Sequence, residues 1–464
     1  MRLDNKWQVL IIVCLGIFMS SLDGSILNIA NPTIAKSMQV DMQDVQWVVT
    51  AYMLVITASL LFFGKLGDNL GGSKIYSYGF LVFTLGSFLC SLSSMLGLLI
   101  AARVIQALGA SMMMATGMGI VSNNFPTSER GKALGITGSV VGIGNMAGPS
   151  LGGLLVGNFH WSAIFLINIP IGLIAFYLSQ KYLPREPIKS FPRQRFDLGG
   201  TILFAVASVA LVIALSTKQG ADFRIFCLGL ILMLMFYLFE KRQAEPVLDF
   251  ELFKIKNFSH GNLLGLAAYI AQTSVLFLIP FYMERLLHFS PSWSGLLMTI
   301  PPCSQAIIAP LAGTLSDRVG SRILTTGSFA VMTAAYLLLS TLDQTTNMFK
   351  ICGGLLLMGI GMGSFGSPNN SSILGSIPRE KAGYAGGFSA TVRNFAFSLG
   401  TAGSVSIFSF FFNNNLANTS YALAYAGATQ SVYRIAAAIT FAALLFSLVR
   451  KHSPQPVQNS SAGL

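Results

Sequence analysis

Asp23 is the residue of this chain best placed for chemistry, because it is a carboxylic acid inside the first long apolar segment. Moving a charged side chain to the centre of a bilayer costs about 2.5–3.5 kcal/mol on insertion scales. Ionisable groups at that depth usually face a water-filled cavity and bind protons or cations. We therefore predict that Asp23 binds a proton. The alternative is a structural carboxylate locked to an arginine.

Arg103 is the predicted partner of Asp23. It lies in the apolar segment 96–121, and its guanidinium stays charged. A charged group within an apolar helix needs a partner, and Asp23 is the only acid that we place deep inside a predicted span. A nearby arginine lowers the pKa of an acid and burial raises it, so we predict that Arg103 holds Asp23 where a conformational change alters its protonation. A permanent ion pair is the alternative.

The remaining residue types argue against metal, redox and nucleotide chemistry. The five cysteines and four histidines are scattered, without the spacing of a metal or redox motif. The sequence has no Gly-x-x-x-x-Gly-Lys-Ser/Thr motif for a nucleotide. An enzyme needs clustered nucleophiles, acids or metal ligands, and a sensor would usually add a soluble domain. We therefore expect no cofactor, no metal, no nucleotide and no enzymatic activity.

The composition predicts an all-α polytopic membrane protein. Hydrophobic residues make up 53% of the 464 residues and charged residues only 10%, whereas soluble proteins carry about 25% charged residues. The apolar residues fall in blocks of about 20, the length of a membrane-spanning helix. The net charge of +12 lies mostly in short loops, where it sets topology. We therefore expect no nucleic-acid partner.

We predict fourteen membrane-spanning helices. With the N-terminus inside, most of the 29 Lys and Arg residues fall in inner loops, which places both termini in the cytoplasm. The spans lie near 7–31, 44–63, 75–93, 96–121, 132–156, 162–183, 198–216, 224–240, 258–283, 293–315, 323–341, 348–371, 384–412 and 430–450.

An internal repeat divides the chain into two halves. Gly64, Asp68 and Gly71 follow the second span, and the same pattern follows the tenth span as Gly313, Asp317, Arg318 and Gly320. This indicates duplication of a six-helix unit, and in transporters built this way the substrate site lies between the repeats. We predict six-helix bundles at 1–183 and 257–451, cytoplasmic linkers with two inserted helices at 184–256, and a cytoplasmic tail at 452–464.

The fifth span carries the most specific motif. It contains a series of small residues and one proline: Gly135, Gly144, Gly148, Pro149, Gly152 and Gly153. Small residues let helix backbones approach closely in membranes, and a proline bends a helix. Ordinary helix packing would explain the same pattern.

These motifs resemble the major facilitator superfamily, and more narrowly its fourteen-helix drug:proton antiporter branch of the QacA/EmrB type. The resemblance covers about residues 7–451. It rests on the fifth-span motif, on Leu22–Pro32, on Arg103–Ala110 and on both inner-loop repeats. It implies two six-helix bundles plus two inserted helices. The chain departs from the pattern at Asn31, where the family usually has Leu, and in the first inner loop at Asn69, Gly72 and Ser73.

The resemblance also implies roles for the motif residues. Asp23 and Arg103 would take part in proton coupling, and the fifth helix would seal against leak. A carboxylate of the inner-loop motif, Asp68 or Asp317, would latch the inner side shut on a helix N-terminus of the other bundle. The two bundles would rock about a central site to alternate access.

The predicted function is a proton-coupled multidrug exporter in a bacterial inner membrane, with protons, lipophilic molecules and membrane lipids as partners. One carboxylate neutralises one charge, so we expect neutral or monocationic substrates. The alternative is an exporter of a metabolite, a lipid or a metal–tetracycline complex, for which Arg393 would favour an anionic group. The candidate substrate contacts are Gln46, Tyr52, Gln106, Met113, Asn145, Tyr269, Gln272, Phe277, Asn370 and Arg393.

Overall fold

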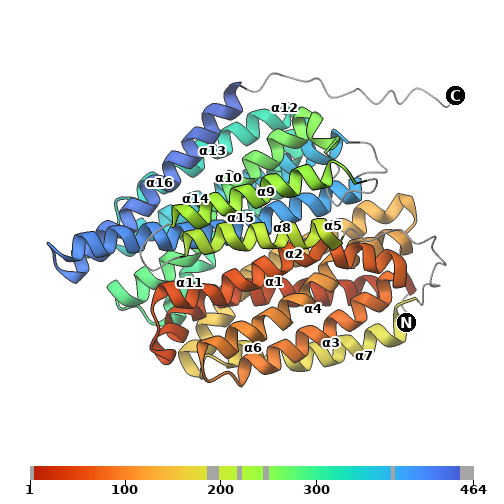
Figure 1. Cartoon of the computed structure of the whole chain (residues 1–464), viewed down its shortest axis with the longest axis horizontal. Helices are drawn as coiled ribbons and strands as arrows, with labels where there is room; N and C mark the ends of the chain where they lie inside the picture. Colours follow the sequence, from red (N-terminus) through yellow and green to blue (C-terminus); the bar gives the residue numbers. More distant parts are fainter. Residues whose placement is uncertain (1–4, 185–197, 217–221, 244–249, 378–381, 450–464) are drawn as a thin grey trace.

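The computed structural model describes residues 5–184, 198–216, 222–243, 250–377 and 382–449, and within these ranges its regular structure is entirely helical (Figure 1). Two helical halves lie against each other. The first half comprises α1 (Asn5–Met38), α2 (Met42–Leu70), α3 (Gly72–Ser91), α4 (Leu96–Asn124), α5 (Thr127–Asn158), α6 (Ala163–Leu166) and α7 (Asn168–Tyr182). The second half comprises α10 (Lys256–Phe281), the π-helical turn η2 (Tyr282–Leu286), α11 (Pro291–Met298), α12 (Ile300–Val319), α13 (Ser321–Leu339), α14 (Met348–Gly375), α15 (Ala382–Leu416) and α16 (Tyr421–Val449).

Two further helices, α8 (Leu198–Leu215) and α9 (Phe223–Glu240), and the 3₁₀ turn η1 (Leu252–Lys254) connect the halves. α8 packs against α9, and also against α2 of the first half and α15 of the second. A small buried apolar cluster joins Leu54 of α2, Val212 of α8 and Ala402 of α15. The inserted helices therefore cover one side of the seam between the halves.

The prediction of membrane-spanning helices is confirmed for most of the predicted spans. Eleven helical segments of the described chain are long and apolar enough to cross a membrane, and Gly199–Leu215 is a shorter apolar helix. α2 and α3, with 29 and 20 residues, lie outside that set. A helix or a pair of helices covers each of the fourteen predicted ranges. Fourteen crossings stay a prediction.

Two predicted spans stay continuous as the candidate membrane spans Ala163–Tyr182 and Pro291–Ser316, but one turn residue interrupts each helix near a proline. The predicted span 162–183 divides into α6 and α7, and the predicted span 293–315 divides into α11 and α12. Pro170 has no N–H to donate to the carbonyl of Leu166, where α6 ends. Pro301 and Pro302 likewise interrupt the hydrogen bonding that would join α11 to α12. The last helix also begins at Tyr421, earlier than the predicted 430.

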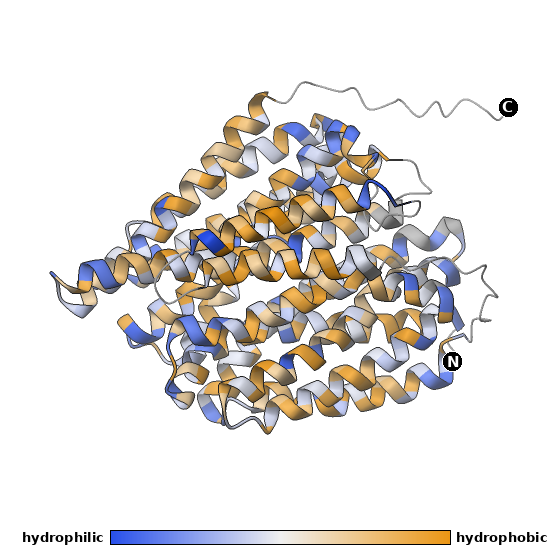
Figure 2. Cartoon of the chain, viewed as in Figure 1, coloured by the Kyte–Doolittle hydropathy of each residue, from blue (hydrophilic) through white to orange (hydrophobic). Residues whose placement is uncertain are grey.

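The outer faces of the helices suit a hydrocarbon environment. Figure 2 shows apolar residues along most of each helix. On α9 the side chains of Ile231, Leu234 and Met235 are all more than half exposed. Such continuous apolar surface would be a liability in water but matches the lipid interior that a spanning helix crosses.

Candidate functional site

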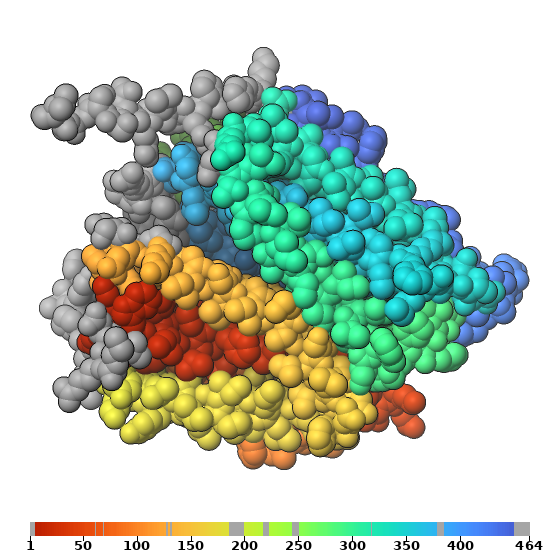
Figure 3. Space-filling model, turned by 180° about the vertical axis from the view of Figure 1, so that it is seen from behind, coloured from red at the N-terminus to blue at the C-terminus, as the bar shows by residue number. Residues whose placement is uncertain are grey.

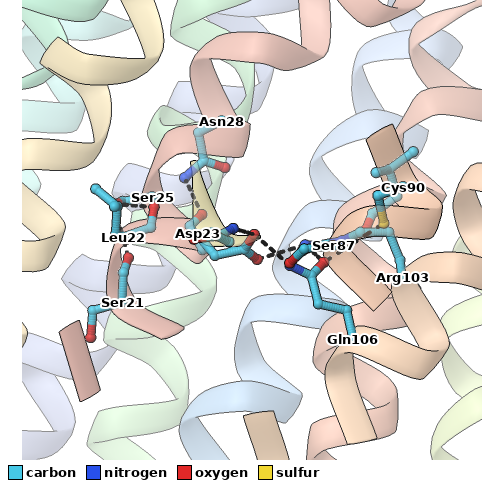
Figure 4. A network of polar contacts seen from close by, with 12 residues as sticks. Ser21, Leu22, Asp23, Ser25, Asn28, Ser87, Cys90, Arg103 and Gln106 are labelled. Atoms are coloured by element: carbon cyan, nitrogen blue, oxygen red, sulfur yellow. Dashed lines mark hydrogen bonds and ion pairs between the residues drawn. The ribbon is translucent and has the colours of Figure 1, made fainter. Parts of the chain in front are cut away.

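Asp23 and Arg103 form an ion pair in the interior of the first half. The Asp23 Oδ2 atom lies 2.6 Å from Arg103 Nη1, joining α1 to α4 (Figure 4). Each side chain is only 1% exposed. Burying two charges costs several kcal/mol per ion, and the attraction between them offsets that cost only with good geometry and further hydrogen bonds. The pair should therefore come with additional polar partners.

Those partners are carboxamides and a hydroxyl from three helices. Gln106, one turn after Arg103, accepts from Arg103 Nη1 at 2.6 Å and donates its Nε2 to Asp23 Oδ1 at 2.8 Å. The same Nε2 lies 2.8 Å from Ser87 Oγ of α3. Asn168 at the start of α7 donates to Asp23 Oδ1 at 3.2 Å. The carboxylate thus accepts three hydrogen bonds, and we call Asp23, Arg103, Gln106, Ser87 and Asn168 the charged centre.

The second helix completes the surroundings of the guanidinium. The Arg103 Cζ atom lies 3.9 Å from the centroid of the Tyr52 ring. Arg103 Nε donates to the backbone carbonyl of Val48 at 3.2 Å. A cation over an aromatic face is attracted by the ring quadrupole, and more strongly when it is desolvated. The guanidinium is therefore held by α1, α2 and α4 together.

Several buried polar groups of the first half lack a hydrogen-bond partner among the residues that the structure describes. They include the Tyr52 hydroxyl, Gln46 Oε1, Thr50 Oγ1, Asn168 Oδ1 and both polar atoms of the Asn31 carboxamide. Asn31, Gln46 and Thr50 are fully buried, and Gln46 Nε2 donates to Gln43 at 2.9 Å. An unmade hydrogen bond in the interior costs about 1–3 kcal/mol. Such groups are commonly satisfied by water.

The glycine motif of α5 lies directly on α1. A Cβ atom on Gly148 would come within 2.7 Å of the Ser25 Cβ and 2.9 Å of the Ile26 nitrogen. A Cβ on Gly144 or Gly152 would also lie within 2.8 Å of α1 side-chain atoms. Only glycine permits this backbone approach.

The far end of the same motif touches the second half. A Cβ on Gly153 would lie 2.7 Å from the carbonyl oxygen of Pro291 in α11 and 3.0 Å from the Gly295 Cα. Gly295 in turn lies against the carbonyl oxygen of Pro149. The two halves are therefore in close backbone contact where α5 meets α11.

The halves separate toward the beginning of α5. No atom of the described residues lies within 4 Å of a Cβ placed on Gly135. Figure 3 shows a hollow between α5, drawn in orange, and α12, drawn in green, with the blue helix α15 at its back. Asn145 of α5 and Asn370 of α14 are both exposed. The structure is thus closed at the α5–α11 contact and open at the opposite end of the seam.

The two inner-loop motifs share one backbone geometry. Gly71 and Gly320 both have positive φ angles, 95° and 87°, which favour glycine, and each ends one helix and precedes the next. Within the described part of the chain, no atom lies within 4 Å of a Cβ on Gly64, whereas a Cβ on Gly313 would approach Ser367 of α14. Arg318 is exposed. The side chains of Asp68 and Asp317 lie outside the described part of the structure, and their latch role stays a prediction.

The other candidate substrate contacts lie in different environments. Met113 packs against Gly16 and Gly79 in the first half, and Phe277 packs against Phe281. Both are 1% exposed, and core packing accounts for them. Tyr269 on α10 and Arg393 on α15 are half-buried, and Gln272 is 7% exposed.

Sequence reasoning missed two members of the charged centre and gave a third another role. Ser87 and Asn168 were not singled out as partners of Asp23, and Gln106 was predicted to contact substrate although its side chain bonds within the centre. A usable signal existed for two of them. Gln106 is one turn from Arg103, and Asn168 is a carboxamide within an apolar segment. Within the described residues, no group of three His, Cys, Asp or Glu side chains is arranged to hold a metal.

Comparison with known proteins gives consistent matches. A family model described as the Major Facilitator Superfamily matches residues 13–401. The chain is 47% identical over 446 residues to the riboflavin transporter RibZ of Clostridioides difficile, covering 96% of this chain and 98% of that protein. It is 31% identical to the tetracenomycin C resistance and export protein of Streptomyces glaucescens, covering 86% of this chain and 75% of that protein.

Solved structures share the fold at low sequence identity. A bacterial homologue of the human lysosomal transporter Spinster, in an inward-facing and unoccupied conformation, matches with a TM-score of 0.66 and 16% identity, covering 98% of this chain and all of that chain. The nucleoside transporter NupG matches with a TM-score of 0.65 and 14% identity, covering 97% of this chain and 100% of that one.

Proposed function

The chain belongs to the Major Facilitator Superfamily and is a multi-pass membrane transporter, and we propose that its substrate is riboflavin or a close chemical relative. One observation carries this proposal: the 47% identity to a riboflavin transporter extends over 96% of this chain and 98% of the relative. The sequence similarity to that transporter extends over both halves of the chain, and so over the helices that border the hollow between them.

The chemistry of the chain is compatible with such a substrate. Riboflavin is uncharged and combines a flat aromatic ring system with a polyhydroxy chain. Pockets for ligands of this kind need aromatic surface and a few placed polar groups. The carboxamides of Asn145 and Asn370 are exposed, and the ring of Tyr269 is half-buried. The Asp23 carboxylate is already paired with Arg103, so it does not provide a free negative charge for a dicationic substrate. An uncharged substrate needs no such charge.

We further propose that transport is coupled to protons through Asp23, with Arg103 as the partner that holds the carboxylate when it is ionised. The bundles 1–183 and 257–451 would rock about the seam to alternate access, and the glycines of α5 would form the moving contact. Both termini would be cytoplasmic, as the Lys and Arg distribution favours. The open end of the hollow would then face the cytoplasm, because α5 begins on that side.

A multidrug exporter of the fourteen-helix branch is the second candidate. Its support is the likeness to export proteins such as the one for tetracenomycin C, at 31% identity. This identity is lower than that to the riboflavin transporter, and it extends over less of both chains. The proposal of a multidrug exporter therefore has less support than the proposal of a riboflavin transporter.

Counterflow in reconstituted vesicles tests the proposal without requiring any ion gradient. Vesicles are loaded with unlabelled riboflavin and diluted into labelled riboflavin. We expect transient accumulation above protein-free vesicles, with unlabelled riboflavin competing far better than ethidium. Absence of counterflow would contradict the riboflavin proposal, and preferential competition by ethidium would favour the drug exporter.

A further inference from the structure

A second acid lies near the closed end of the seam, which the proposed topology places outside and which we call the outer end. Glu284 belongs to the π-helical turn η2 that follows α10, and turns of this kind often mark functional positions. Its side chain is half-buried, and its Oε1 atom is buried without a hydrogen-bond partner among the described residues. Transport coupled through Asp23 does not use this carboxyl, so its burial needs a separate explanation.

The charged neighbours of Glu284 come from both halves. Lys36, in the last turn of α1, and Arg285, the next residue of η2, act electrostatically on its carboxyl. Within the described residues the carboxyl forms no ion pair with either cation. The helix α16 also packs against η2, but its Tyr425 interacts with Arg285 rather than with Glu284.

The polar neighbour of Glu284 is a buried hydroxyl of α11. The Ser294 hydroxyl faces the carboxyl, and the Ser294 side chain is fully buried. The two groups do not meet with hydrogen-bond geometry, because Ser294 Oγ and Glu284 Oε1 both lack a partner in the described part of the chain. Two neighbouring groups that could satisfy each other are thus both unsatisfied.

These residues border the contact that closes the outer end. Ser292 Oγ of α11 donates to the Gly153 carbonyl of α5 at 3.1 Å. The hydroxyl oxygens of Thr299 and Ser150, also from opposite halves, lie 2.6 Å apart. The helix α1 contacts both α10 and α11. Opening this end would separate α1 and α5 from α11 and let water reach Glu284.

A proton on Glu284 would satisfy both groups while the outer end is closed. A carboxylate only accepts hydrogen bonds, whereas a protonated carboxyl also donates one, and Ser294 Oγ can accept it. The hydroxyl could instead donate to the carboxylate, but a single neutral donor does not compensate the burial of a charge. Lys36 and Arg285 favour the ionised form. Lys36 is exposed, however, so water weakens its attraction, and the Arg285 guanidinium lies 5.3 Å from the centroid of the Phe281 ring.

We propose that Glu284 is a proton-binding site of the outer end, separate from Asp23. Glu284 takes up a proton from outside as this end closes, donates it in a hydrogen bond to Ser294, and returns it to the outside as this end opens and water hydrates the carboxylate. The inference rests on the proposed alternating access, and neither on the identity of the substrate nor on coupling through Asp23. Acidic solution should therefore favour the closed outer end.

The distance between spin labels on Leu92 and Phe349 tests this proposal. Leu92 follows α3 and Phe349 lies at the start of α14, so they mark the outer ends of the two halves, and their side chains are 65% and 78% exposed. The labels are attached to ketone-bearing amino acids, so the native cysteines stay. Pulsed electron resonance gives the ratio of short to long distances. One proton changes this ratio by at most tenfold per pH unit, and we expect it to fall by about tenfold or more between about pH 5 and pH 8.

Substitution of Glu284 should abolish this response. Glu284→Gln stays neutral at every pH, so its ratio should change less than about twofold over the same range. Should that protein fail to fold, Ser294→Ala replaces it. There the carboxyl loses the acceptor for its proton, and the opening of the outer end should move to lower pH.

Two other acids serve as controls. Asp41 is exposed at the same end of the first half, and its side chain makes no capping bond to α2, so Asp41→Asn should respond to pH as the wild type does. Asp23→Asn should also keep the response. A wild-type ratio that does not change with pH, a response that persists in Glu284→Gln, or one that disappears in Asp41→Asn or Asp23→Asn would overturn the proposal. None of these results bears on riboflavin transport, which counterflow tests separately.

Discussion

Neutralising Asp23 should destabilise the protein, and neutralising Arg103 as well should restore most of the lost stability. The Asp23 carboxylate accepts from Arg103 at 2.6 Å, from Gln106 at 2.8 Å and from Asn168 at 3.2 Å. In Asp23→Asn, the guanidinium of Arg103 would stay 1% exposed with only neutral acceptors, Gln106 and the Val48 carbonyl. Breaking a buried pair by removing one partner costs about 3–5 kcal/mol. We expect the lower end, because asparagine keeps the shape.

Removing both charges should have a much smaller effect. Replacing a buried ion pair by neutral groups of similar volume is often neutral or stabilising. We therefore expect Asp23→Asn with Arg103→Gln to lie within about 1–2 kcal/mol of the wild type, although each single substitution costs about 3 kcal/mol. The non-additivity is then several kcal/mol, as expected for residues in direct contact.

Reversible unfolding in mixed micelles, followed by circular dichroism, measures all four proteins of this cycle. Gln106 is left unchanged, so that the remaining hydrogen bonds are the same throughout. An Asp23→Asn protein within about 1 kcal/mol of the wild type, or a double variant whose loss of stability equals the sum of the two single losses, would show that the buried pair is not coupled in this way.

Substitutions elsewhere in the chain should also have measurable effects. Gly148→Val should destabilise by about 1–3 kcal/mol and slow counterflow, because its Cβ would collide with Ser25; Gly138→Ala, with open space around it, should do neither. Asn31→Leu should stabilise the protein in thermal unfolding, because it removes two unpaired buried polar atoms; a lower melting temperature would contradict this. Hydrogen bonds from the Thr345 N–H and hydroxyl lower the pKa of Asp343. The ionised carboxylate therefore stabilises the loop around Asp343 at pH values above the usual aspartate pKa, and this stabilisation is lost as the pH falls through the lowered pKa. Amide exchange of this loop in Asp343→Asn should be faster than in the wild type at neutral pH and equal to it in strong acid.

The helical architecture and the family could be predicted from sequence because both depend on local patterns. Long apolar blocks predict the all-helical polytopic fold, and the motif residues predict the superfamily; both predictions are confirmed. The breaks at Ile167 and Thr299 were missed although the prolines that cause them are visible in the sequence. Proline is frequent in membrane helices, so its presence does not by itself predict an interruption.

The contacts of the polar residues could be predicted only where charge demanded a partner. The proximity of Asp23 and Arg103 follows from the cost of an unpaired buried charge. No such demand singles out Ser87 or Asn168, because neutral polar side chains are satisfied in many ways, commonly by the backbone of their own helix. The substrate was also beyond the sequence motifs, and the riboflavin proposal comes from the comparison over the whole chain.

Proton movement during riboflavin transport can be measured directly in vesicles. Vesicles containing a trapped pH-sensitive dye receive a riboflavin gradient and no imposed pH gradient. We expect the wild type to change the internal pH as riboflavin moves. We expect Asp23→Asn still to exchange riboflavin in counterflow without changing the pH. Riboflavin movement by the wild type without any pH change, or an equal pH change in Asp23→Asn, would show that Asp23 does not couple riboflavin transport to protons.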